Sequence, residues 1–177
     1  MKCFCASLLV LVVSSAIAQQ SPPATFKDAL LDRLIGEWKI AGVVHGQPSN
    51  QTLRADWVLH HQFLRMYEKS SENVASKDFP FEAVFFIGYD DDKKQYVVHL
   101  MDVFGGRDSE TLGYGKRGED NISFTFKNTD SSVTEKFTYE AKSNSWHIVS
   151  SVTTPEGKQI PILDLTATPS PVNTSSK

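Results

Sequence analysis

The stretch NISFTFKNTDSSVTEKFTY, residues 121–139, decides the fold class of this chain. In its first half, the apolar residues Ile122, Phe124 and Phe126 alternate with polar ones. The second half repeats the alternation after a short polar turn. A period of two is typical of a strand with one face buried and the other in water. The stretch therefore predicts two strands of an antiparallel sheet.

Similar period-two segments, separated by polar or glycine-containing turns, extend from this stretch in both directions. Strands are predicted at Trp38–His45, Gln51–His60, Phe63–Lys69, Phe81–Tyr89, Gln95–Val103, Thr111–Lys116, Asn121–Phe126, Ser132–Tyr139, Trp146–Val152 and Gln159–Ala167, with a bulge at His60-His61-Gln62. Many short strands at this spacing predict a sandwich or a barrel.

A closed barrel is favoured because an open sheet of about ten strands would expose two long edges. No segment after residue 36 predicts a helix long enough to cover such a sheet. The predicted fold is thus mainly β, an antiparallel up-and-down barrel of about eight to ten strands. A sandwich is the alternative.

One short helix is predicted before the strands, over Thr25–Ile35, where leucines recur near helical spacing and Asp28 follows Thr25 as in a capping box. Gly36 ends it. The predicted organisation is a signal peptide over residues 1–18, a flexible leader over 19–24, a barrel domain over 25–167 and a disordered tail over 168–177.

The composition fits an ordinary globular domain: 177 residues, 40% hydrophobic and 22% charged, with a net charge of -3. These values exclude collagen-like, disordered and multi-span membrane classes. Without a basic face, no nucleic-acid partner is expected.

The N-terminus reads as a cleaved export signal. An apolar run follows Lys2 and ends at the small-residue site Ala16-Ile17-Ala18. Cleavage after Ala18 removes both cysteines, Cys3 and Cys5, so no disulfide is expected. The mature chain is expected to be secreted or periplasmic, with no membrane span.

A family resemblance rests on Gly36-Glu37-Trp38, where the predicted helix meets the first strand. Gly-x-Trp at this point resembles the signature of lipocalin-type (calycin) barrels. Together with Ile87-Gly88-Tyr89-Asp90, it is also similar to a family of bacterial lipocalin-like proteins of unknown function. The resemblance implies a ligand cavity with the Trp below it, at the closed end. The Arg that lipocalins often place against this Trp is missing from Gln159–Ala167.

The nitrobindin-like haem barrels share this shape and hold iron through a His in the last strand, shortly after a Pro. Here Pro161 is followed by no His in that strand. No haem, and no other cofactor, is therefore expected.

The predicted ligand-binding residues combine an aromatic lining with a few polar groups, as small-molecule pockets do. Glu135 lies on the predicted inward face, and Arg65 and His99 are expected to join it. An ion pair, or strand faces assigned the wrong way round, is the alternative interpretation of Glu135 and Arg65. The aromatic candidates are Trp57, Phe85, Tyr114, Phe124 and Phe137.

Three functional hypotheses remain open. The first is a secreted protein that binds a small hydrophobic or amphipathic ligand without catalysis. The second is a small-barrel enzyme of the cyclase, isomerase or esterase type, using His99 or Glu135. The third is a filled barrel with a structural or interaction role. No catalytic motif such as Gly-x-Ser-x-Gly and no metal-ligand spacing is present, and a homodimer is allowed.

Overall fold

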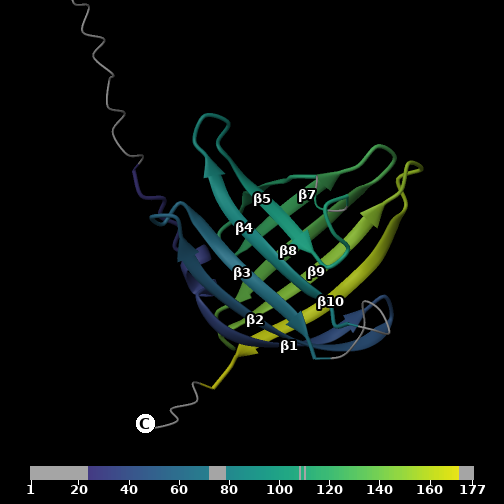
Figure 1. Cartoon of the computed structure of the whole chain (residues 1–177), viewed down its shortest axis with the longest axis horizontal. Coiled ribbons are helices and arrows are strands. Elements are labelled where there is room, and N and C mark those ends of the chain that lie inside the picture. Colours follow the sequence, from purple (N-terminus) through teal and green to yellow (C-terminus); the bar gives the residue numbers. More distant parts are fainter. Residues whose placement is uncertain (1–23, 72–78, 108, 110, 172–177) are drawn as a thin grey trace, which may run out of the picture.

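Ten strands and one turn of 3-10 helix make up the structure, a computed structural model that describes residues 24–71, 79–107, 109 and 111–171 (Figure 1). The elements are η1 (Leu31–Leu34), β1 (Gly36–Val44), β2 (Gln47–Val58), β3 (Phe63–Ser70), β4 (Glu82–Asp90), β5 (Gln95–Asp102), β6 (Gly113–Arg117), β7 (Asn121–Lys127), β8 (Ser132–Glu140), β9 (Ser145–Thr153) and β10 (Gln159–Pro169). In the part of the chain described, no helix is long and apolar enough to cross a membrane.

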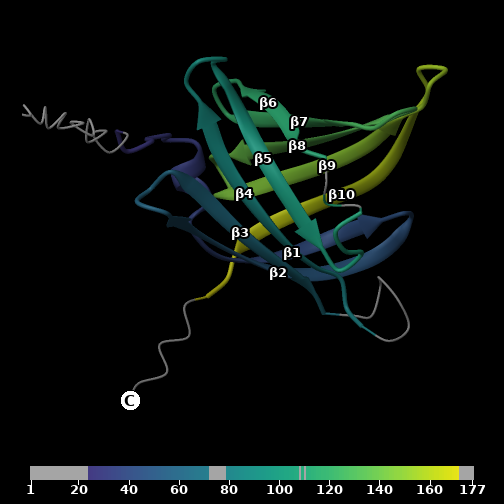
Figure 2. The same ribbon diagram turned by 45° about the horizontal axis from the view of Figure 1, so that its top comes forward.

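The strands form a closed barrel in which each pairs antiparallel with its neighbours in sequence. The barrel closes where β1 pairs with β10, in a register that runs from Trp38 opposite Pro169 to Val44 opposite Leu163. Figures 1 and 2 show these two strands, from opposite ends of the chain, side by side. The predicted antiparallel barrel is confirmed, and the sandwich alternative is wrong.

Alternate residues of each strand fill the barrel interior. Ile122, Phe124 and Phe126 are all buried, as their alternation predicts. The polar residues between them face outward. The largest fully buried side chains include Trp146, Phe124, Ile40, Leu53, Leu64, Met66 and Ile87, so the core is the lumen of the barrel itself.

The predicted helix over Thr25–Ile35 is wrong in length, because only Leu31–Leu34 is helical, as one 3-10 turn. The side chain of Asp28 accepts the backbone N–H of Leu30 at 2.8 Å and that of Leu31 at 3.0 Å. Bonds from a side-chain oxygen to the N–H groups two and three residues further on are those of an N-cap, so the helical turn begins only after Asp28. At Gly36 the backbone takes a φ of +123°, which turns the chain into β1.

Other boundaries also differ from the prediction. Residues 59–62 form the turn between β2 and β3, and three of them, Leu59, His60 and His61, have positive φ, so the segment is not a bulge within a strand. The last strand continues to Pro169, two residues into the predicted tail. The predicted signal peptide and most of the predicted leader lie outside the described residues.

One end of the barrel, called the closed end below, is covered by residues 26–34. The indole N–H groups of Trp38, Trp57 and Trp146 all donate to residues 32–34, at 2.7, 2.8 and 3.3 Å. The ring of Phe26 packs edge-on against Trp57, with the centroids 5.7 Å apart. The leucines of this segment are buried, so it closes the lumen as an apolar plug.

A buried carboxylate fastens the plug to the strands. Asp28 is 4% exposed and accepts two backbone N–H bonds at the start of the plug. It also accepts the hydroxyl of Tyr96 on β5, and the guanidinium of Arg117 on β6 lies 3.3 Å from it. Every oxygen of this carboxylate therefore has a partner, as burial of a charge requires.

We predict that Asp28→Ala lowers the free energy of unfolding by about 3 kcal/mol, because it leaves the Tyr96 hydroxyl and two backbone amides without their acceptor. Urea denaturation followed by tryptophan emission measures this. The control is Asp91→Asn, in an exposed turn where the side chain is 87% exposed. A loss no larger for Asp28→Ala than for the control would contradict the role given to the plug.

Candidate functional site

The interior opens into two adjoining cavities at the end of the barrel opposite the plug, called the open end below. Their volumes are about 290 and 460 Å³, and both are lined by Glu68, Phe81, Ile162 and Leu163. The strands place these residues together because β3 ends, and β4 and β10 begin, at this end. We call the two together the lumen cavity.

The walls of the lumen cavity are mostly apolar, with a small number of polar groups among them. The apolar lining includes Phe85, Leu100, Phe126, Val133 and Leu163. The polar lining includes Ser49, Gln51, Glu68, Asp102, Glu135 and Ser150. This mixture is typical of small-molecule sites.

Glu135 is held inward by the alternation of β8. It is 9% exposed and lies between Val133 and Phe137, which face the same side of the strand. Across the sheet it stands opposite Phe124 and Ser150. Burial raises the pKa of Glu135 to about 7, because the charged form loses its hydration.

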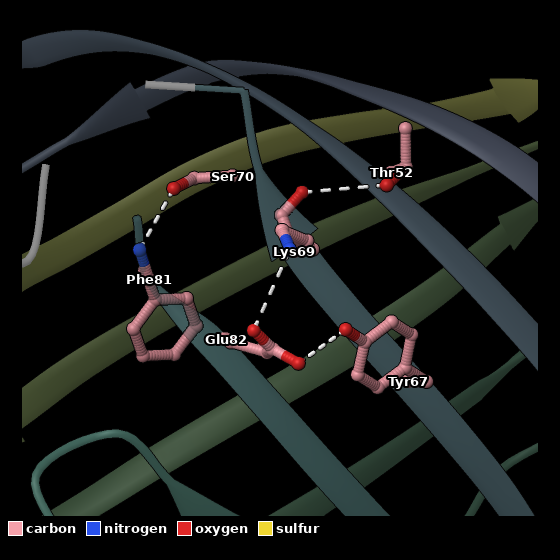
Figure 3. A network of polar contacts seen from close by, with 6 residues as sticks. All are labelled: Thr52, Tyr67, Lys69, Ser70, Phe81 and Glu82. Atoms are coloured by element: carbon pink, nitrogen blue, oxygen red, sulfur yellow. Dashed lines mark hydrogen bonds and ion pairs between the residues drawn. The ribbon is translucent and has the colours of Figure 1, made fainter. Parts of the chain in front are cut away.

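Glu68 points into the cavity because its two neighbours on β3 are held outside. Figure 3 shows Tyr67 and Lys69 both reaching Glu82 of β4 on the outer face. The hydroxyl of Tyr67 donates to the Glu82 carboxylate, and Lys69 Nζ lies 3.6 Å from it. Since side chains alternate along a strand, Glu68 faces the lumen.

The edge of the same strand pair is fastened in the same way. In Figure 3 the hydroxyl of Thr52 donates to the carbonyl of Lys69 at 3.4 Å, and Ser70 Oγ accepts the backbone N–H of Phe81 at 2.9 Å. These contacts join β2, β3 and the start of β4 beside the cavity. The position of Glu68 is thus set by the surrounding sheet.

The two glutamates act on each other. Burial, together with the charge of Glu135, raises the pKa of Glu68 to about 8. Among the described residues, neither carboxyl has a hydrogen bond or an ion-pair partner. Both carboxyls therefore stay protonated to a higher pH than an exposed glutamate does, Glu68 up to about pH 8 and Glu135 up to about pH 7.

Gln51 lines the larger of the two cavities. It is 5% exposed, and its Nε2 donates to Ser49 Oγ at 3.0 Å. Its Oε1 is buried and has no hydrogen-bond partner within the described structure. On the inner face of β2, Gln51 lies one inward position from Leu53, which stands opposite Glu68.

The structure places five of the eight predicted ligand-binding residues inside the barrel. Phe85 and Glu135 line the lumen cavity. Phe124 and Phe137 are buried in the packed interior, with ring centroids 6.4 Å apart. Trp57 lies at the closed end, where it binds the plug, and does not line the cavity.

The other three lie on the outer face of the barrel. The expected inward orientation of Arg65 is wrong: its Nη2 is 2.8 Å from Asp56 Oδ2 on the outside of β2. His99 and Tyr114 are exposed, and their neighbours on either side in the strands face inward. Arg65 lines a groove of about 500 Å³ on this outer face, which is more open to solvent than the lumen cavity.

Two cavity residues, Glu68 and Gln51, were not among the sequence-predicted site residues. Both lie an even number of residues from buried apolar residues of the same strand, and so on the same face: Glu68 with Leu64 and Met66, and Gln51 with Leu53. That parity is the signal that identifies them. Within the described ranges, no group of three or more His, Cys, Asp or Glu side chains is arranged to hold a metal ion.

Comparison with known proteins places the chain in a wider group. A family model described as "Protein of unknown function (DUF1579)" matches residues 24–167. No curated protein matches the chain. The matched range includes the plug and every strand except the end of β10.

We predict that the free energy of unfolding falls by about 2 kcal/mol or more between about pH 5 and pH 8.5 because of Glu68 and Glu135. Both have folded-state pKa values above the unfolded value, so the folded chain binds more protons in this range and loses stability as pH rises. The double variant Glu68→Gln/Glu135→Gln should remove most of this fall and be more stable at the upper pH.

Urea denaturation across this pH range measures the effect. The matched control Glu119→Gln/Glu140→Gln removes two carboxyls from exposed positions. If the double cavity variant loses stability with pH as steeply as the control, the two glutamates are not the cause.

Proposed function

We propose that the chain, which belongs to this family of proteins of unknown function, binds a small hydrophobic or amphipathic molecule in the lumen cavity. The observation that carries the proposal is a cavity of several hundred Å³ with apolar walls inside a closed barrel. Cavities of this size hold small organic ligands. Affinity would come from burying the apolar part of the ligand.

The arrangement of the two ends supports this proposal. The plug and the three tryptophans close one end of the barrel, so a ligand in the lumen would not pass through that end. The other end is the entrance. The resemblance of Gly36-Glu37-Trp38 to the lipocalin signature agrees with this arrangement, because Trp38 is buried at the closed end. A filled barrel with a purely structural role is less favoured, since the lumen keeps free volume.

A second candidate is an enzyme that moves a proton. It is favoured by one observation, the raised pKa values of Glu68 and Glu135, which suit general acid–base chemistry near neutral pH. Isomerisation is the reaction class that this pair fits. His99 has no part in such a reaction, because it lies on the outer face.

We also propose that the protein is exported, on the strength of the apolar N-terminal run and the site at Ala16-Ile17-Ala18. The expected partner is the small ligand.

We predict that a neutral lipophilic dye, Nile red, binds the protein and that Val133→Phe weakens its affinity about tenfold, because the larger ring fills part of the lumen cavity. Dye fluorescence and the tryptophan emission of the protein measure binding. The matched control is Val84→Phe, the same change on the outer groove of β4. Equal binding by wild type and Val133→Phe, with loss in Val84→Phe, would place the dye site outside the barrel.

A further inference from the structure

We infer that the ligand of the lumen cavity is a lipophilic amine, a molecule with an apolar body and a protonated amino group. The amino group is held by the carboxylates of Glu68 and Glu135. This inference rests on the proposed binding function and names the chemical class of the ligand.

The first argument is the charge of the lining. Three carboxyl groups, those of Glu68, Asp102 and Glu135, line the cavity. No Lys or Arg lines it in the described chain. The one basic side chain on the lining is His45, in the turn between β1 and β2 at the entrance. When its carboxyl groups are ionised, this lining repels fatty acids and other anions and attracts cations.

The second argument is that the fold leaves these charges uncompensated. The cation expected beside Glu135 was Arg65, and it is bound to Asp56 on the opposite side of the sheet. Lys69, next to Glu68 in β3, is likewise held outside by Glu82. An ionised carboxylate in an apolar site is costly without a counter-charge. A bound ammonium group would supply that counter-charge from the ligand.

The apolar walls supply the rest of the site. Phe85, Leu100, Phe126 and Val133 surround the carboxyl groups in the smaller of the two cavities. A bare inorganic cation would leave this surface exposed to water. An alkyl or aryl amine covers it and gains the burial energy of its apolar part. The combination of apolar walls and acid groups selects amphipathic cations.

Binding of a cation is coupled to proton release. Because burial raises the pKa of Glu68 to about 8 and that of Glu135 to about 7, an entering ammonium group favours their ionised forms and releases protons to the buffer. Affinity should then rise with pH up to about pH 8.5. Asp102 and His45, at the rim, are the other titratable groups that face the cavity.

The test uses three probes with the same alkyl chain: decylamine, decan-1-ol and decanoate. Isothermal titration calorimetry with the full-length mature protein gives their affinities at about pH 8.5 and about pH 5.5. We expect decylamine to bind about tenfold more tightly than decan-1-ol at the higher pH, and decanoate to bind most weakly. The preference for the amine should shrink to about threefold or less at the lower pH.

Variants test whether the carboxyl groups of Glu68 and Glu135 cause the preference for decylamine over decan-1-ol. Glu68→Gln and Glu135→Gln should each remove most of the preference for decylamine over decan-1-ol, together with the proton release seen in buffers of different ionisation enthalpy. Glu119→Gln/Glu140→Gln, with its changes on the surface, should behave as wild type.

The outcomes separate the two proposals. Equal binding of decylamine and decan-1-ol, or tighter binding of decanoate, overturns the amine inference and leaves the binding function standing. An amine preference that persists in both cavity variants also overturns it. If none of the three probes and no Nile red binds, the proposed binding function is wrong and the inference fails with it.

Discussion

The pairing of β1 with β10 is the contact on which the other features of the structure depend. Seven residue pairs join the two strands, from Trp38 and Pro169 to Val44 and Leu163. Without this seam the sheet would have two free edges, and its apolar face would need a second layer to cover it. With it, every inward position faces the inward positions of the opposite wall, and the sheet covers its own core.

Closing the sheet into a cylinder leaves its two ends uncovered by strands. The two ends differ in what covers them. At the closed end, the segment directly before β1 forms the plug, and three indole N–H groups donate hydrogen bonds to it. The open end has no such segment among the described residues, and its lumen keeps free volume. In the described structure, the plug thus lies at one end of the barrel and the free volume at the other.

The fold was largely predictable because it depends on a period of two that local sequence displays. The strand from Asn121 and its neighbour from Ser132 begin at the predicted residues. The helix over Thr25–Ile35 was overestimated, because leucine spacing does not reveal that Asp28, rather than Thr25, accepts the first backbone N–H bonds, so that the helical turn begins only after it.

The site was predictable only in part, because periodicity cannot choose between two apolar faces. In β3, one face carries Phe63 and Tyr67 and the other Leu64 and Met66, so Arg65 was assigned to the wrong side. The cross-strand contact with Asp56 decides the matter, and it depends on register. Glu135 had no such ambiguity, because only one face of its strand is apolar.

A comparison of the buried carboxyls within the barrel shows what distinguishes the lumen cavity. At the closed end, Asp28 has two backbone amides, a tyrosine hydroxyl and a guanidinium as partners. At the open end, Glu68 and Glu135 have none within the described structure. Asp28 thus has all its partners within the protein, whereas Glu68 and Glu135 have none there and favour the protonated form.

That difference has an energetic meaning. A carboxyl whose partners are all within the protein stabilises the fold and has no unmet interaction through which to bind a ligand. A carboxyl without partners lowers stability as it ionises, and the interaction it lacks remains available to whatever enters the cavity. When they ionise, the two acids at the open end lower the stability of the protein and become able to bind a positive charge. A cation in the cavity would pair with the ionised carboxylates and offset that loss of stability.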